Sequence, residues 1–304
     1  MTKAAIYFNE LQPLLYGYYI CKGVIFLHRK MSAAVFTVLT AMFVCGCTSD
    51  KNTVGQSARH NDRGGITPAE TAFLTDGKEK VCYGQGYETD SDNRPVGATQ
   101  AQEKYGSYGG RFIFGKDDKT ICLTFDEGYE NGCTGKILDI LKEKKVTATF
   151  YVTLDYVKSS PELVQRMINE GHEVGNHSCT HPSLPDISDD MVFEEIHGLE
   201  TYISDNFGGY KTVTMRPPRG EFSVRTLRIA QNMGYDTVLW SFAYNDWNTD
   251  AQPDRDTAYR RITSATHNGA VYLLHAVSET NTAILPDVID YWLDNGYTVK
   301  SISG

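Results

Sequence analysis

From residue 120 to the end of the chain, short runs rich in β-branched and aromatic residues alternate with amphipathic helical stretches. Helix-period segments such as 136–144, 161–171 and 282–296 separate these runs, and a glycine closes the last two, as expected where a helix ends. Strands that alternate with helices in this way form parallel sheets with the helices packed outside. The expected strands are residues 120–125, 147–153, 172–177, 212–217, 236–242, 270–276 and 297–302.

Polar side chains lie at the carboxyl ends of several of these strands. A closed barrel brings the carboxyl ends of all its strands around one rim, whereas a flat sheet does not. The pattern therefore predicts an α/β fold, a seven-stranded (β/α) barrel, with its active site at this end. The strand-end residues are Asp126, His177, Arg216, Asp246 and His275.

Two adjacent carboxylates, Asp126 and Glu127, stand where the first of these strands ends. Two like charges at one site ionise together only if a cation neutralises one of them. His177 and His181 are four residues apart, a spacing that places both imidazoles on one side of a helical turn, where they can bind one metal ion. Paired histidines at this spacing also occur as ordinary core or surface residues, and the neighbouring carboxylate is what favours a metal site. Two nitrogens and one oxygen leave a divalent ion an open position for water, as in a hydrolytic site.

The first 47 residues have the order of a secretory targeting segment. Positive residues at 28–30 precede an apolar run at 33–44, which is too short to span a bilayer as an anchor. The run ends at Gly46 and Cys47, a pair similar to a bacterial lipoprotein processing site with Cys47 as the lipidated residue. We therefore expect a lipoprotein at the extracytoplasmic face of the cell membrane.

Two alternatives stay open for this region. A signal cleaved without lipid attachment fits the same apolar run. Residues 1–30 fit neither a signal nor a domain, which a start site assigned too far upstream would explain.

Composition limits the rest of the chain. Residues 48–102 are polar and poor in aliphatic side chains, so we expect a flexible tether with a short motif before the barrel domain at 103–304. The formal net charge of -9 argues against a nucleic-acid partner, because phosphate binding requires a basic excess. Aromatic residues make up 12% of the chain, which suits either the stacking of sugar rings or ordinary core packing. No protein partner is evident.

Five motifs occur in order along the predicted barrel. They resemble the motifs of the polysaccharide deacetylases, the NodB-like family-four carbohydrate esterases, and the likeness extends over residues 82–303. It is greatest for the enzymes that remove acetyl from muramic acid when the δ-lactam of spore cortex is made. The resemblance implies a distorted barrel of the NodB type, and a peptidoglycan glycan strand as partner. The motifs are LTFDEGYENG from Leu123, GNHSCTHP from Gly175, MRPPRGEFS from Met215, WSFAYNDW from Trp240 and YLLHAVSETN from Tyr272.

The resemblance also implies catalytic roles for four of the matching residues. Asp126 corresponds to the general base that takes a proton from the metal-held water, and Arg216 to the arginine that orients this base. His275 corresponds to the general acid that protonates the leaving amine. Asp246 corresponds to the partner that keeps the imidazole charged and oriented.

Other matching positions imply metal and substrate contacts. Glu127 corresponds to the carboxylate that joins His177 and His181 on the metal, the backbone N–H of Arg219 to an oxyanion donor, and Trp247 to a wall beside the acetyl methyl group. Most relatives carry aspartate where this chain has Glu127, and glutamate, one methylene longer, binds from a shifted angle or not at all. The expected cofactor is a divalent metal, with zinc first and cobalt, manganese and iron as alternatives.

The expected function is therefore a hydrolase that removes the N-acetyl group from amino sugars of peptidoglycan, with N-acetylmuramic acid as the first candidate. One alternative keeps the chemistry and changes the substrate to chitin-like or xylan polymers. The other is a glycan-binding barrel that lost turnover through the change at Glu127. An acid and a base together, His275 and Asp126, disfavour a mere binder because binding needs neither.

Overall fold

A parallel sheet forms the centre of the protein in the computed structural model, which describes residues 77–304. The targeting segment, Cys47 and the first part of the predicted tether lie outside the described residues. All neighbouring strands of this sheet run parallel, and each predicted strand lies at its predicted place. These strands are β3 (Thr120–Glu127), β4 (Thr149–Val152), β5 (Glu173–Asn176), β6 (Thr214–Met215), β8 (Asp236–Val238), β9 (Ala270–His275) and β10 (Thr298–Lys300).

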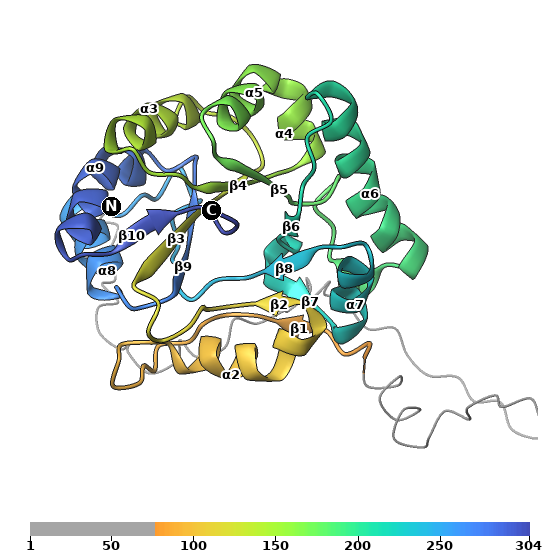
Figure 1. Cartoon of the computed structure of the whole chain (residues 1–304), viewed down its shortest axis with the longest axis horizontal. Helices are drawn as coiled ribbons and strands as arrows, with labels where there is room; N and C mark the ends of the chain where they lie inside the picture. The colour runs from red at the N-terminus through yellow and green to blue at the C-terminus, as the bar shows by residue number, and fades with distance from the viewer. Residues whose placement is uncertain (1–76) are drawn as a thin grey trace, which may run out of the picture. The chain divides into compact units, whose positions relative to one another are not determined.

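The sheet curls back on itself. Its order runs from β9 through β3, β4, β5 and β6 to β8, and the chain directly after β8 returns to β9 through a parallel bridge between Phe242 and Tyr272. The short strand β2 (Gly110–Arg111) pairs with β8, and β10 pairs with the start of β3. Figure 1 shows the strands around the centre and the helices outside them. The predicted fold class, a seven-stranded (β/α) barrel with distorted closure, is therefore confirmed.

Helices follow the strands and pack against the outside of the sheet. Several begin at a side-chain cap, as where Ser278 accepts a hydrogen bond from the backbone N–H of Asn281. None of the helices between residues 77 and 304 is long and apolar enough to cross a membrane. The helices around the sheet are α3 (Thr134–Lys144), α4 (Leu154–Ser159), α5 (Pro161–Asn169), α6 (Asp189–Asn206), α7 (Val224–Asn232), α8 (Arg255–Ser264) and α9 (Glu279–Asp294).

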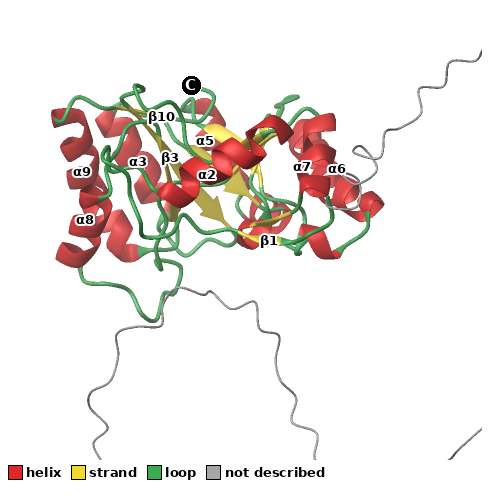
Figure 2. Cartoon of the chain, turned by 90° about the horizontal axis from the view of Figure 1, so that it is seen from below, coloured by secondary structure: helices red, strands yellow, loops and turns green. Residues whose placement is uncertain are grey.

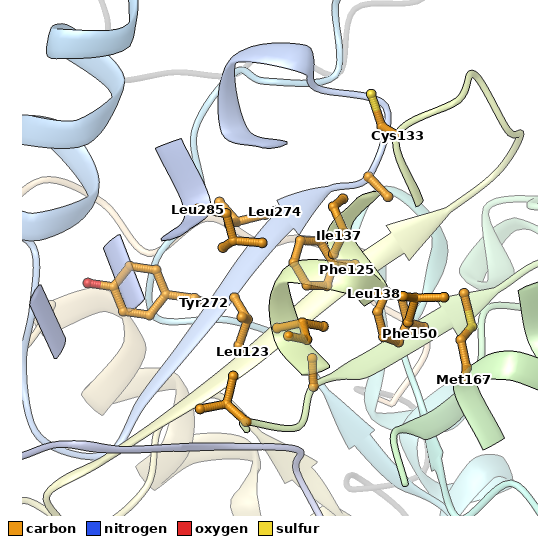
Figure 3. Close-up of a cluster of buried hydrophobic side chains, with 14 of the residues drawn as sticks. Leu123, Phe125, Cys133, Ile137, Leu138, Phe150, Met167, Tyr272, Leu274 and Leu285 are labelled. Atoms are coloured by element: carbon orange, nitrogen blue, oxygen red, sulfur yellow. The ribbon is translucent and has the colours of Figure 1, made fainter. Parts of the chain in front are cut away.

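Strand alternation divides the buried side chains between two layers. Leu123 and Phe125 of β3 join the large cluster between the sheet and the helices, which Figure 3 shows. Cys122 instead packs with Tyr151 in a smaller cluster on the inner face of the curled sheet. By the same alternation, Asp126 and Glu127 leave β3 on opposite faces.

Residues 77–102 belong to the fold, although composition predicts that the tether continues through residue 102. Helix α2 (Val96–Tyr105) buries Ala98, Ala101 and Tyr105. Ala101 and Tyr105 belong to a buried cluster that also includes Phe112, Phe222 and Leu227. Figure 2 shows α2 lying across the strands. Two small alanines and one tyrosine at helical spacing are enough to dock the helix, which an average over a polar segment cannot reveal.

Gly175 in β5 provides the space that the buried ring of Tyr151 occupies. A Cβ at Gly175 would lie 2.4 Å from Cε1 of Tyr151, and that ring is fully buried and cannot move freely. We expect Gly175→Ala to lower the free energy of unfolding by about 1–3 kcal/mol because of overpacking, as measured by urea denaturation. The matched control is Gly135→Ala in α3, where the new methyl meets only Leu163 at 4.0 Å. Helix propensity favours alanine over glycine at position 135 by up to about 1 kcal/mol. Equal losses of unfolding free energy in the two variants would contradict the packing argument.

Candidate active site

The carboxyl ends of β3 and β9 bring together the two residues predicted to handle protons. Asp126 and His275 are direct partners in the register of these neighbouring parallel strands. Adjacent strands lie about 4.8 Å apart, so side chains at paired positions stand side by side. Residues 149 positions apart in sequence (275 - 126) thus share one edge of the barrel.

Asp126 is held by a buried cation. Nη1 of Arg216 donates a hydrogen bond to Oδ1 of Asp126 at 2.8 Å, and the arginine side chain is fully buried. Burial by itself would raise the pKa of Asp126, but the charge and hydrogen bond of Arg216, together with His177 and His275, outweigh it and keep that pKa below the ordinary 3.8. Asp126 is therefore an ionised carboxylate at neutral pH and is able to accept a proton.

Arg216 is itself fixed in place on several sides. Its Nε donates to the carbonyl of Val238 at 3.1 Å and its Nη2 to that of Leu239 at 3.2 Å. Its guanidinium carbon lies 4.3 Å from the centroid of the Tyr151 ring, a cation–π contact. Tyr151 is a site residue that was not predicted from the sequence, because nothing in the strand run TATFYVT distinguishes this ring from other core aromatics.

His275 forms a close pair with Asp246. Its Nδ1 lies 2.7 Å from Oδ1 of Asp246, and its backbone N–H donates to Oδ2 at 2.8 Å. Burial by itself would lower the pKa of His275, but the hydrogen bond and the negative charge of Asp246 together raise it above the ordinary 6.5. The shift therefore favours the protonated imidazole that a general acid needs.

Two further predicted residues stand at this end of the barrel. The ring of Trp247 is half exposed and its centroid lies 5.5 Å from that of His275. Arg219 has a left-handed backbone with φ of 61°, between Pro218 and Gly220 in the 3₁₀ turn Pro218–Gly220. Its positive charge helps to lower the pKa of His181, although burial contributes more, so Arg219 also belongs to this region.

His177 and His181 meet, but not on a helical turn. Their ring centroids are 4.9 Å apart, while Ser178 and His181 both adopt left-handed backbone angles, with φ of 67° and 58°. The predicted helical spacing is thus replaced by an irregular loop after β5. Nδ1 of His177 bonds to the carbonyl of Arg216 at 2.8 Å, which turns Nε2 toward Oδ2 of Asp126 at 3.5 Å. Burial lowers the pKa of His177 to about 4, so its Nε2 lone pair is available at neutral pH.

Glu127 was predicted to join His177 and His181 as the third metal ligand, but its side chain does not lie beside them. Both of its carboxyl oxygens lie 3.4 Å from Oγ1 of Thr134, at the start of α3, on the helix side of β3. Burial, reinforced by the charge of Glu130, raises the pKa of Glu127 well above the ordinary 4.5. The physical reason for the correction is strand alternation, because β3 continues through Glu127 and turns its side chain away from that of Asp126.

The residues of this site match a metal only in part. Two neutral imidazoles suit a divalent cation. Nδ1 of His177 also bonds to a backbone carbonyl, and a hydrogen bond of this kind commonly orients a metal-binding histidine. Within residues 77–304, no group of three His, Cys, Asp or Glu side chains is arranged to hold a metal ion. The predicted set of His177, His181 and Glu127 is therefore not assembled.

Comparisons with known proteins find relatives of this chain in sequence and in structure. A family model described as polysaccharide deacetylase matches residues 115–238. An uncharacterized 30.6 kDa protein of Geobacillus stearothermophilus is 42% identical over 218 residues, which are 71% of this chain and 82% of that protein. The peptidoglycan-N-acetylmuramic acid deacetylase PdaA of Bacillus subtilis is 42% identical over 200 residues, 66% of this chain and 75% of PdaA. The solved structure of PdaA, a family 4 carbohydrate esterase, matches with a TM-score of 0.70 at 38% identity, covering 74% of this chain and 96% of that one.

The position of Glu127 predicts how stability depends on pH. Because the pKa of Glu127 is raised on folding, its contribution to stability is full below about pH 4.5 and is lost as the pH rises through the folded-state pKa. Glu127→Gln cannot ionise, so we expect it to be more stable than the wild type by about 1 kcal/mol at pH 8, with a smaller difference at pH 4.5. Urea denaturation at both pH values measures this. Glu143→Gln, at an exposed position of α3, is the control without a pH-dependent difference. A glutamine variant at position 127 that is less stable than the wild type at pH 8 would argue against a neutral buried carboxyl.

Proposed function

The chain belongs to the polysaccharide deacetylase family, and on that premise we propose that it removes the N-acetyl group from N-acetylmuramic acid in peptidoglycan. The observation that carries the proposal is the pairing of Asp126 with His275 across β3 and β9, a carboxylate with a lowered pKa beside an imidazole with a raised pKa. The choice of sugar is supported by the identity of 42% with PdaA.

Hydrolysis of an acetamide needs both of these groups. The carbonyl is a poor electrophile and the amine a poor leaving group, so water must lose a proton and the nitrogen must gain one. Asp126, held by Arg216, accepts the proton from water. Nδ1 of His275 is engaged by Asp246, which leaves Nε2 to donate the proton to the departing amine.

A divalent metal is the second part of the proposal. Enzymes of this family are generally metal-dependent. His177 and His181 are the residues of this chain that would hold the ion, with zinc as the first candidate. A bound divalent cation would polarise the acetyl carbonyl and acidify water. Comparing activity before and after treatment with a chelator tests this dependence.

The place of action is also proposed. The charged residues at 28–30, the apolar run at 33–44 and Cys47 favour a lipoprotein on the outer face of the cell membrane. Peptidoglycan is the polymer present there, so the proposed location and the proposed substrate agree. Sequencing the amino terminus of the native protein and testing Cys47 for lipid examine this part of the proposal.

Loss of the proposed base should abolish turnover. We expect Asp126→Asn to reduce acetate release from purified peptidoglycan by about 10²–10⁴-fold, because the amide cannot accept the proton from water. Asp294→Asn, at the exposed end of α9, makes the same chemical change away from the site and should retain full activity. Mass spectrometry of the digested glycan identifies which sugar has lost acetyl. Equal acetate release by the Asp126 variant and the wild type would refute the role of Asp126, and loss of acetyl from glucosamine alone would refute the choice of sugar.

The two perturbed pKa values predict a broad pH optimum. Asp126 must be ionised, and its lowered pKa places the acid limb of kcat/KM below pH 3.8. His275 must be protonated, and its raised pKa places the alkaline limb above pH 6.5. We expect Asp246→Asn to move the alkaline limb to lower pH, because burial then lowers the pKa of His275 with only the charge of Asp126 opposing it. An alkaline limb that stays in place in this variant would be inconsistent with the proposed acid.

A further inference from the structure

We propose that Asn281 is a positioning residue, which holds the carboxylate of Asp246 in the orientation that His275 requires. This inference rests on the proposed function for its catalytic meaning, while its geometry stands on the contacts alone. Asn281 is the third residue of α9 and is buried, with 2% of its surface exposed. The proposal does not require Asn281 to bind a metal or to contact the substrate.

The contacts of Asp246 show why a positioning residue is required. The carboxylate is fully buried and receives three hydrogen bonds in the structure. Two come from His275, and the third is donated by Nδ2 of Asn281 to Oδ2 at 2.6 Å. A buried carboxylate that lacked this third donor would lose part of its hydrogen bonding and would be held only by the residue that it has to orient, His275.

Tyr244 determines which end of the Asn281 amide faces Asp246. Its hydroxyl donates a hydrogen bond to Oδ1 of Asn281, so the NH₂ group must point the other way, toward the carboxylate. The ring of Tyr244 is buried and lies 5.4 Å from the guanidinium carbon of Arg261 in α8. The chain of contacts therefore runs from Tyr244 through Asn281 and Asp246 to His275.

The start of α9 also holds the backbone of the loop that carries Asp246. The backbone N–H of Asn281 donates to the cap hydroxyl of Ser278 at 3.0 Å, and that hydroxyl donates to Oε1 of Gln252 at 2.5 Å. Nε2 of Gln252 in turn donates to the carbonyl of Asp246 at 2.7 Å. Both the main chain and the side chain of Asp246 are thus tied to the first turn of one helix.

Orientation matters here because several charges surround the pair. His275 is influenced by Asp126 from β3, by Arg216 after β6 and by Asp246, while Arg261 and Tyr244 face the far side of Asn281. Burial by itself would lower the pKa of His275, and the hydrogen bond to Asp246 is the largest influence in the opposite direction. Rotation of the Asp246 carboxylate would remove that bond and so lower the pKa of His275.

The test is an NMR titration of His275 in the full chain, with His275→Gln used to assign the imidazole signal. Asn281→Leu keeps the approximate side-chain volume and removes both hydrogen bonds, and we expect it to lower the pKa of His275 by about one unit or more. Tyr244→Phe frees the amide without removing it and should lower the same pKa by less. Tyr272→Phe is the matched control, because it deletes a buried hydroxyl that bonds the carbonyl of Ile262 at 3.0 Å, and it should leave the pKa unchanged.

Activity measurements give the second readout. Asn281→Leu should lower kcat for acetate release about tenfold, with KM within about twofold, because proton donation fails while substrate binding stays. Failure of the wild type to release acetate would overturn the proposed function, whereas the titration would still test the positioning. An unchanged pKa of His275 in both Asn281→Leu and Tyr244→Phe would overturn the positioning role and reduce Asn281 to a helix-start residue.

Discussion

The buried ion pair between Arg216 and Asp126 is the interaction on which the rest of the site depends. A fully buried guanidinium is costly unless its charge and its donors are matched, and here carbonyls, an aromatic ring and one carboxylate match them. The pair keeps Asp126 ionised in a place where burial would otherwise protonate it. The base therefore takes its character from a residue 90 positions later in the chain.

Two neighbouring carboxyl groups, Asp126 and Glu127, are accommodated in different ways. The first is ionised and paired with Arg216, and the second turns to the helix side of β3, where burial favours its proton. Strand alternation produces this separation, since consecutive side chains leave a strand on opposite faces. A shared metal ion is thus not required to explain why the two charges stand side by side in sequence.

The acid is built by a different device from the base. His275 and Asp246 come from the ends of β9 and the loop after β8, and the first turn of α9 holds them in mutual contact through Asn281, Ser278 and Gln252. Hydrogen bonds to a rigid helix start are well suited to holding the Asp246 carboxylate against His275, because a residue on a loop is positioned less precisely than one tied to a helix. The two halves of the proton-handling pair are therefore supported independently, one from the barrel interior and the other from its outer helices.

Hydrophobic periodicity was sufficient to place seven strands of the curled sheet, its class and the strand ends that carry Asp126, His177, Arg216, Asp246 and His275, because a parallel β/α pattern leaves few other arrangements. The two-residue strand β2, which pairs with β8, is too short for periodicity to reveal. The motifs in their order were sufficient to identify the family. Three things depended on folding: the turn of Glu127 away from the histidines, the left-handed loop that joins His177 to His181, and the docking of residues 77–102. The turn of Glu127 follows from the continuation of β3 to residue 127, two residues beyond the predicted end of that strand. The other two follow from local backbone angles and from contacts between residues distant in sequence, and neither kind of information is contained in periodicity or composition.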